Sequence, residues 1–142
     1  MTARESIPAP LRLAISGPSA IHDATEAARK FADASGIDGA DRSRLAIIVE
    51  ELVTNLYDHG GLGTGDVFGI ELSATDSDIG VIITDRGRAF DPRTAPLDLR
   101  IPSKGAGAGL RLVRDWATHA DYHRTGGQNR LALVLPRSAR RD

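Results

Sequence analysis

The stretch EELVTNLYDHG, residues 50–60, ends a segment in which apolar side chains recur at helical spacing. The apolar positions are Leu45, Ile48, Val49, Leu52 and Leu56. This spacing predicts an amphipathic helix that packs on a core by one face. We expect Asp41 to cap this helix at its N-terminus and Gly60 and Gly61 to end it.

Polar residues stand beside the apolar stripe of the same helix. Glu51, Asn55 and His59 are four residues apart and therefore share one side. Asparagine is a mediocre helix former because its side chain competes for backbone hydrogen bonds, so Asn55 next to a buried face needs a partner. Two interpretations stay open at this point. The residues are ordinary boundary polars, or they form a pocket in which an amide oxygen binds a hard cation and a carboxylate is a general base.

A second polar anomaly ends the predicted strand GVIITDRG, residues 80–87. Val81, Ile83 and Asp85 share one face by the period of two, so the carboxylate continues an apolar surface. Such a carboxylate must be hydrogen-bonded or lie at the mouth of a cavity. Pro92, a few residues later, forces Asp91 into an extended conformation. Asp85 therefore either begins a tight turn or lines a cavity.

Glycines alternate in the stretch SKGAGAGLRLVRDW, residues 103–116, directly before a predicted helix. A dinucleotide-binding GxGxxG starting at Gly105 would need glycine at position 110, which is Leu110. A P-loop is excluded because Lys104 precedes the glycines instead of following them. What remains is a glycine-rich turn leading into a helix N-terminus, where free backbone amides and the helix dipole favour phosphate.

The other segments complete the expected order of elements. Alternation of Leu11, Leu13 and Ile15 predicts a half-buried strand, and Ser19 is placed to cap a helix over residues 20–34. Residues 66–87 predict two strands joined by the polar turn TDSD. An irregular segment over 91–104 has the length of a lid or binding loop, and two strands, ADYHRTG and NRLALVLP, follow the last helix.

This order favours an α+β fold in a single domain over residues 1–142, with its core at about 10–135. We expect a two-layer α/β sandwich whose helices cover one face of a mixed, mostly antiparallel sheet. The formal net charge of −1 gives no bulk attraction to nucleic acid or to a membrane surface. Cysteine is absent, which excludes thiolate chemistry and sulfur-ligated metals. No apolar run approaches the roughly 18 residues of a membrane span, so we expect a cytoplasmic protein.

Together and in this order, three motifs resemble the boxes of the GHKL superfamily of ATP-binding domains. EELVTNLYDHG is similar to its N-box, ITDRGRAFDP to its first glycine box, and GAGAGLRLV to its second. Within the superfamily, the short chain, the ELVTN wording and the FDP look most like the stand-alone serine-protein kinases that act as anti-sigma factors. The resemblance implies the Bergerat ATP-binding fold, with ATP and Mg²⁺ held between the helices and the sheet.

By matching position, the resemblance also implies residue roles. Glu51 would be the general base for a seryl hydroxyl and Asn55 the Mg²⁺ ligand. Asp85 would accept a hydrogen bond from the adenine amino group, and Gly87 would let the base approach. The remaining cofactor-binding positions implied are Asp58, His59, Phe90, Lys104, Gly105, Ala106, Gly107, Ala108, Gly109 and Leu110.

The function that follows is an ATP-dependent serine/threonine protein kinase that binds a sigma factor and phosphorylates an anti-sigma antagonist. The resemblance implies a homodimer with no direct contact to nucleic acid or membrane. Two alternatives stay open. One is a nucleotide-binding regulatory switch without catalysis, and the other is the ATPase domain of a histidine kinase that acts in trans.

Overall fold

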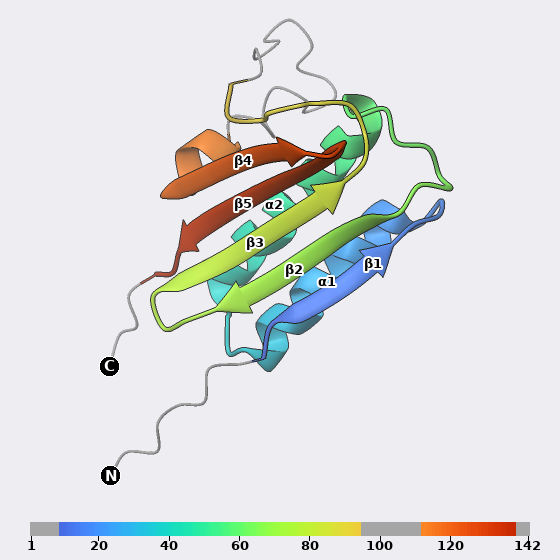
Figure 1. Cartoon of the computed structure of the whole chain (residues 1–142). Helices are drawn as coiled ribbons and strands as arrows, with labels where there is room; N and C mark the ends of the chain where they lie inside the picture. The colour runs from blue at the N-terminus through green and yellow to red at the C-terminus, as the bar shows by residue number, and fades with distance from the viewer. Residues whose placement is uncertain (1–8, 95–111, 139–142) are drawn as a thin grey trace, which may run out of the picture.

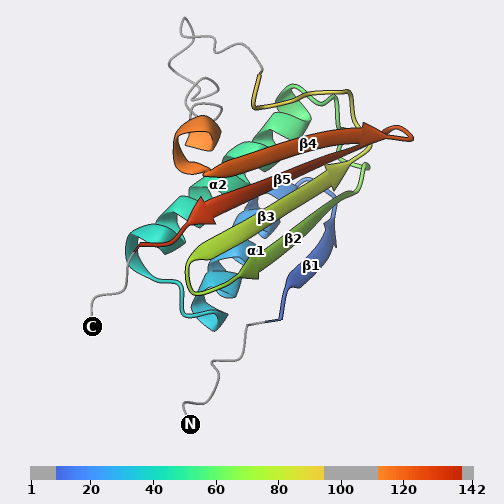
Figure 2. The same ribbon diagram turned by 60° about the vertical axis from the view of Figure 1, so that its left-hand side comes forward.

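The computed structural model describes residues 9–94 and 112–138 of the chain. Two layers make up this part of the molecule, a twisted sheet and a pair of helices that cover one of its faces (Figures 1 and 2). The elements in chain order are β1 (Leu11–Ile15), α1 (Ala20–Ala34), α2 (Gly39–Asp58), β2 (Phe68–Ala74), β3 (Asp78–Asp85), β4 (His119–Thr125) and β5 (Gln128–Pro136). Residues 112–116 are also helical. The expected α+β sandwich is confirmed.

The sheet has the strand order β1-β2-β3-β5-β4, and all four pairings between these described strands are antiparallel. Residues Thr75 and Ser77 form the polar turn between β2 and β3, as predicted, with the Thr75 hydroxyl accepting from the backbone of Ser77 and Asp78. Gly126 and Gly127 both have positive φ and close the hairpin between β4 and β5. The β3–β5 register places Asp85 directly opposite Asn129.

The core lies between the sheet and the helices because each element buries one face. In β2, β3 and β5, every second residue is buried, which matches the period of two. The α1 helix contributes alanines, and α2 contributes larger side chains. The buried apolar residues of α2 are Leu45, Ala46, Ile48, Val49, Leu52 and Val53.

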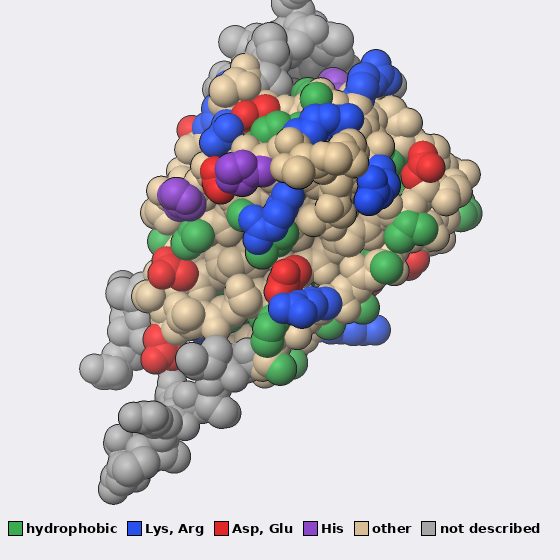
Figure 3. All heavy atoms as spheres, viewed as in Figure 1, with side chains coloured by type: hydrophobic (Ala, Val, Ile, Leu, Met, Phe, Trp, Pro, Cys, Tyr) green, Lys and Arg blue, Asp and Glu red, His purple; other side chains and the backbone are tan. Residues whose placement is uncertain are grey.

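The other face of the sheet has no helical layer over it in the described part of the chain. Figure 3 views this face and shows charged and His side chains scattered among hydrophobic side chains and areas of backbone and other side chains. Two glycines lie close to side chains of the neighbouring strands. A Cβ at Gly69 would lie 2.6 Å from Thr84 Oγ1, and one at Gly80 would lie 2.5 Å from Ser73 Oγ. This face therefore adds little apolar burial, and the functional groups gather instead at one end of the sheet.

Three local predictions differ from the structure. Leu13 was expected on a buried face, but it is 39% exposed because β1 is an edge strand. Asp41 does not cap α2. The helix begins at Gly39 after Asp38, and the Asp41 carboxylate accepts hydrogen bonds from Ser138 N and Oγ, 2.9 Å each. Ser19 does precede α1, but its side chain makes no capping hydrogen bond.

Among residues 9–94 and 112–138, no helix combines the length and the apolar character that crossing a membrane requires.

Candidate functional site

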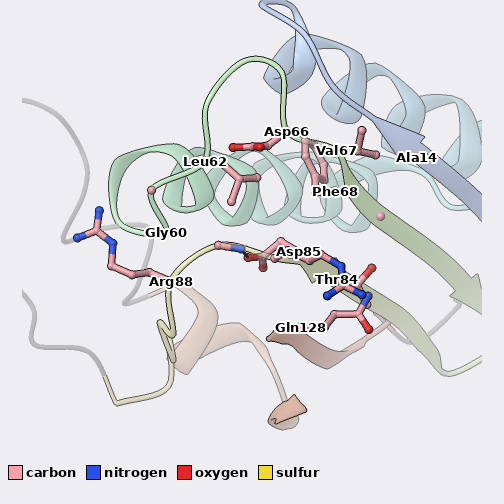
Figure 4. Close-up of a pocket in the computed structure, with 14 residues that line it drawn as sticks. Ala14, Gly60, Leu62, Asp66, Val67, Phe68, Thr84, Asp85, Arg88 and Gln128 are labelled. Atoms are coloured by element: carbon pink, nitrogen blue, oxygen red, sulfur yellow. Dashed lines mark hydrogen bonds between the residues drawn. The ribbon is translucent and has the colours of Figure 1, made fainter. Parts of the chain in front are cut away.

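A cavity of about 650 Å³ lies at the end of the sheet where β3 ends and β2 begins. Leu62 and Phe68 lie on one side of it and Asp85 on the other (Figure 4). The segment that connects α2 to β2 contributes Gly60, Gly61, Leu62, Asp66 and Val67 to the lining. Residues at and after the end of β3 contribute Thr84, Asp85, Arg86, Gly87 and Arg88. Of the described residues that the sequence predicted as a site, Asp85 and Gly87 line this cavity. Its lining does not include Glu51, Asn55, Asp58, His59 or Phe90.

Asp85 is 6% exposed and lines this cavity. Its Oδ1 accepts hydrogen bonds from Gly87 N at 2.8 Å and from Asn129 Nδ2 at 3.0 Å. Both interpretations of Asp85 therefore hold, because the carboxylate forms a local turn with Gly87 and also faces a cavity. Both hydrogen bonds use Oδ1, so Oδ2 is the oxygen left to accept a donor from a ligand.

Gly87 occupies a place where no side chain fits. A Cβ at this position would lie 2.4 Å from Gly60 O and 2.5 Å from Leu62 Cδ1. The next residue, Arg88, donates its backbone N–H to Gly60 O at 2.7 Å. The close packing of Gly87 against Gly60 joins the end of α2 to the segment after β3, and this packing requires glycine whether or not a ligand is bound.

Asn55 is buried in α2, with 5% of its surface exposed. Its Nδ2 is fully buried and has no hydrogen-bond partner among the described residues. A buried amide without a partner costs about 1–3 kcal/mol, so this NH₂ group calls for an acceptor that the described residues do not supply. Its backbone carbonyl accepts from the N–H groups of His59 and Gly60, which places the amide one turn before the cavity wall.

Glu51 lies one turn before Asn55 on the same side of α2 and is half-buried. Burial raises the pKa of the Glu51 carboxyl, and the negative charges of Glu50 and Asp58 raise this pKa further. A carboxylate with a raised pKa is a stronger base, and a general base works best when its pKa lies near the working pH.

His59 and Phe90 contact each other across the same junction. Their rings are stacked, with centroids 4.9 Å apart and planes 10° from parallel. His59 caps the C-terminus of α2, and Phe90 follows the end of β3. Both were predicted to bind the cofactor, and the structure pairs them with each other. Asp58, predicted in the same set, is exposed.

Arginine side chains form hydrogen bonds with the segment that follows Phe90. Arg93 donates to both Asp91 oxygens and to Ala120 O in β4, and Arg114 Nη2 donates to Pro92 O. Burial alone would raise the pKa of Asp91, but hydrogen bonds from the side chain and backbone of Arg93, with the charges of Arg93 and Arg114, lower it on balance.

Sequence reasoning missed Asn129, Tyr122 and Arg124 beside Asp85. It also missed cavity-lining residues that include Leu62, Asp66, Val67, Phe68 and Gln128. Asn129 is 4% exposed, and its Oδ1 accepts from Tyr122 Oη at 2.5 Å and from Arg124 Nη1 at 2.7 Å. The strand pairing of β3 with β5 was the only signal that could have found it, because it places Asn129 opposite Asp85. The predicted cofactor-binding residues Lys104, Gly105, Ala106, Gly107, Ala108, Gly109 and Leu110 lie outside the described residues.

The described ranges contain no group of three or more His, Cys, Asp or Glu side chains that could hold a metal ion. Magnesium typically keeps several waters and takes only one or two protein oxygens together with phosphates. The atom of Asn55 that lacks a partner is its NH₂ nitrogen, which is a donor and calls for an acceptor such as a phosphate oxygen, whereas only the amide oxygen could bind a cation.

Comparisons with known proteins agree with this geometry. The family model described as "Histidine kinase-like ATPase domain" matches residues 16–135. No curated protein sequence matches the chain.

Two solved structures share the fold. One is the structure of the RsbU and RsbW domains of Rv1364c from Mycobacterium tuberculosis, 20% identical, with a TM-score of 0.62 over 94% of this chain and 34% of that one. This chain thus spans about a third of that protein's crystallised length. The other is the SiaB-SiaC complex from Pseudomonas aeruginosa, 15% identical, with a TM-score of 0.60 over 94% of this chain and 92% of the matched chain.

Proposed function

This chain belongs to the histidine kinase-like ATPase family, and on that premise we propose that it is an ATP-dependent serine/threonine protein kinase that acts as an anti-sigma factor. Its substrate would be a serine or threonine of an anti-sigma antagonist protein. The proposal extends the kinase-like ATPase fold to one acceptor chemistry and one class of partner.

The observation that carries the proposal is the junction between α2 and the end of β3. A cavity lined by Asp85 and Gly87 adjoins the helix that carries the buried Asn55 amide and the half-buried Glu51. A domain that only binds nucleotide has no need of a carboxylate with a raised pKa one turn from a candidate metal ligand. That pair supports phosphoryl transfer over binding alone.

Asp85, Asn55 and Glu51 have separate roles in the proposed reaction. Asp85 accepts the adenine amino group through its free oxygen, which orients the nucleotide at the end of the sheet. Asn55 would hold Mg²⁺ through its side-chain oxygen, and the ion would neutralise charge on the phosphates, which is a large part of what phosphoryl transfer needs. Glu51 takes the proton of the attacking hydroxyl, while the oxygen of that hydroxyl bonds to the γ-phosphorus and ADP leaves.

The partners are argued from the sequence resemblance and from one structural relative. The ELVTN and FDP wording looks most like anti-sigma serine-protein kinases, and this supports a sigma factor and its antagonist as partners. SiaB, which shares this fold, was crystallised in a complex with SiaC. A domain of this architecture can therefore bind a second protein while keeping its sandwich intact.

The chemistry is tested by transfer of label from [γ-³²P]ATP to candidate antagonist proteins from the same genome. Glu51→Gln should abolish transfer and leave ATP affinity largely unchanged. Glu50→Gln is the matched control, because Glu50 is exposed on the neighbouring position of α2. It should keep transfer activity, and its pH profile should move to lower pH because the charge of Glu50 helps to raise the pKa of Glu51. An acid-stable product indicates phosphoserine or phosphothreonine, whereas an acid-labile one indicates a histidine kinase. Binding without transfer in the wild-type protein would indicate a regulatory switch.

We also propose that the chain forms a homodimer through the groove between β1 and α1. This groove has a volume of about 690 Å³ and an apolar floor that includes Leu11, Leu13 and Phe31. A two-fold axis beside Leu13, the middle residue of the edge strand β1, would pair β1 with its copy and set the two α1 helices antiparallel. Asp23 of one copy would then face Lys30 of the other, which makes the surface complementary to itself.

Charge exchange tests this dimer. Asp23→Lys and Lys30→Asp should each shift the mass measured by light scattering toward the monomer, because each places like charges across the axis. The double variant should restore the dimer. A wild-type protein that is monomeric at 100 µM, or a double variant no better than the single ones, would contradict the assignment.

A further inference from the structure

Asn129 is a buried polar residue that the proposed reaction does not use. It lies near the start of β5, directly opposite Asp85 across the β3–β5 pairing, and is 4% exposed. Buried amides are expensive unless their hydrogen bonds are made, so the partners of Asn129 show what its position requires.

The amide nitrogen of Asn129 bridges the whole segment that ends β3. It donates to Asp85 Oδ1 at 3.0 Å, to Arg88 O at 3.0 Å and to Gly87 O at 3.2 Å. Gly87 N donates to the same Asp85 oxygen at 2.8 Å. One side chain therefore fixes both the carboxylate and the backbone that follows it.

The orientation of this amide is set from the other side by β4. Tyr122 Oη and Arg124 Nη1 both donate to Asn129 Oδ1, and Arg124 Nη1 also donates to Gly87 O at 2.9 Å. A reversed amide would direct its NH₂ group at these two donors and its oxygen at the Asp85 carboxylate. The contact of the NH₂ with Arg124 and the contact of the amide oxygen with the Asp85 carboxylate would then be repulsive, so the nitrogen must face Asp85.

We propose that Asn129, held by Tyr122 and Arg124, is a positioning residue that aims Asp85 and thereby sets the preference for a purine with a 6-amino group over one with a 6-oxo group. Asp85 Oδ1 is occupied by Asn129 and Gly87, and this leaves Oδ2 as the acceptor at the cavity. An acceptor held in one place favours an N–H donor and repels a carbonyl. A carboxylate free to turn discriminates less between them. The inference rests on the proposed nucleotide site.

The test compares ATP with ITP, which carries a carbonyl where ATP carries the amino group. Dissociation constants for both, with Mg²⁺, are measured by calorimetry on the wild-type chain and on Asn129→Leu. Wild type should prefer ATP by about tenfold or more, the worth of one well-made hydrogen bond, and Asn129→Leu should bring the ratio close to one. Arg130→Leu is the matched control, because Arg130 is the next residue on the opposite, exposed face and should keep the wild-type ratio.

Milder variants keep the test decisive if Asn129→Leu does not fold. Tyr122→Phe removes one donor to the Asn129 oxygen and keeps the ring, so it should narrow the preference for ATP partially. Asn129→Thr retains a hydroxyl donor beside Asp85 and should restore part of the preference.

The outcomes separate the two claims. A wild-type protein that binds neither nucleotide would refute the proposed function. A wild-type protein that prefers ATP, with variants that weaken ATP and ITP by the same factor, would overturn the inference alone. Such a result would show that Asn129 supports only the fold.

Discussion

Replacement of Gly87 by alanine should damage the junction between α2 and β3 more than its small size suggests. The new Cβ would lie 2.4 Å from Gly60 O, 2.5 Å from Leu62 Cδ1 and 3.0 Å from Asp85 Oδ1. The Leu62 side chain can turn aside, but Gly60 O is backbone and is held by the N–H of Arg88 at 2.7 Å. The two segments must therefore separate.

The cost follows from two contributions. Overpacking a closely packed site typically costs about 1–3 kcal/mol, and the weakened hydrogen bond from Arg88 to Gly60 adds about 1 kcal/mol. Gly87→Ala should therefore lower the free energy of unfolding by about 2–4 kcal/mol. At about 3–4 °C per kcal/mol for a chain of this size, the melting temperature should fall by about 6–16 °C.

The assay is denaturant unfolding followed by circular dichroism, combined with an ATP titration of the folded variant. Gly65→Ala is the matched control, because a Cβ at Gly65 in the same connecting segment meets nothing within 4 Å. The control should unfold within about 0.5 kcal/mol of wild type. A Gly87→Ala protein as stable as Gly65→Ala, with unchanged ATP affinity, would refute the packing argument.

Three further predictions concern single side chains. Asn55→Leu should leave the free energy of unfolding unchanged or raise it by about 1 kcal/mol, because it removes a buried amide nitrogen without a partner. The variant should lose Mg²⁺-dependent ATP binding, and a variant that is much less stable and still binds ATP would contradict this prediction. The rate of phosphoryl transfer should rise with pH through the raised pKa of Glu51, since only the ionised carboxyl accepts a proton. A rate that titrates at or below the ordinary glutamate pKa of about 4.3 would argue against this base. Asp91→Asn should destabilise the protein at pH 7, where the Asp91 carboxylate is paired with Arg93. The difference from wild type in the free energy of unfolding, measured in urea, should shrink as the pH falls below the ordinary aspartate pKa of about 3.9 and through the lowered pKa of the folded state, because the ion pair stabilises the fold only while Asp91 is ionised. A constant difference down to pH 2 would exclude the ion pair as its source.

Local patterns in the sequence were sufficient for most of the elements. The helix predicted over 20–34 coincides with α1, and the turn TDSD joins β2 to β3 as expected. Alternation in NRLALVLP predicted the buried Leu131, Leu133 and Leu135 of β5 correctly. These features depend on neighbours in the chain, which a periodicity or a turn motif records directly.

Features that depend on distant partners could not be read in the same way. Asp41 has the residue type and place of a helix cap, but its carboxylate bonds Ser138, a residue near the other end of the chain. Leu13 alternates like a buried residue, and its exposure follows from the position of β1 at the edge of the sheet.

Part of the candidate site could be predicted, because it too depends on local patterns in the sequence. Asp85 and Asn55 were identified because a polar residue interrupts an apolar face, and both are buried in the structure. Asn129 interrupts nothing, since it follows two glycines and a glutamine at a hairpin. Only the pairing of β5 with β3 gives it a partner, so its role appears with the fold and not before it.

The central claim is that a nucleotide binds where the end of α2 meets the end of β3. The most direct measurement is a titration of ¹⁵N-labelled protein with ATP and Mg²⁺, followed by NMR. The account predicts saturable shifts of the Asn55 side-chain NH₂ and of the Gly87 and Arg88 backbone amides at one nucleotide per chain, with the Asn55 response requiring Mg²⁺. Spectra that do not change at millimolar ATP, or shifts confined to residues far from this junction, would contradict it.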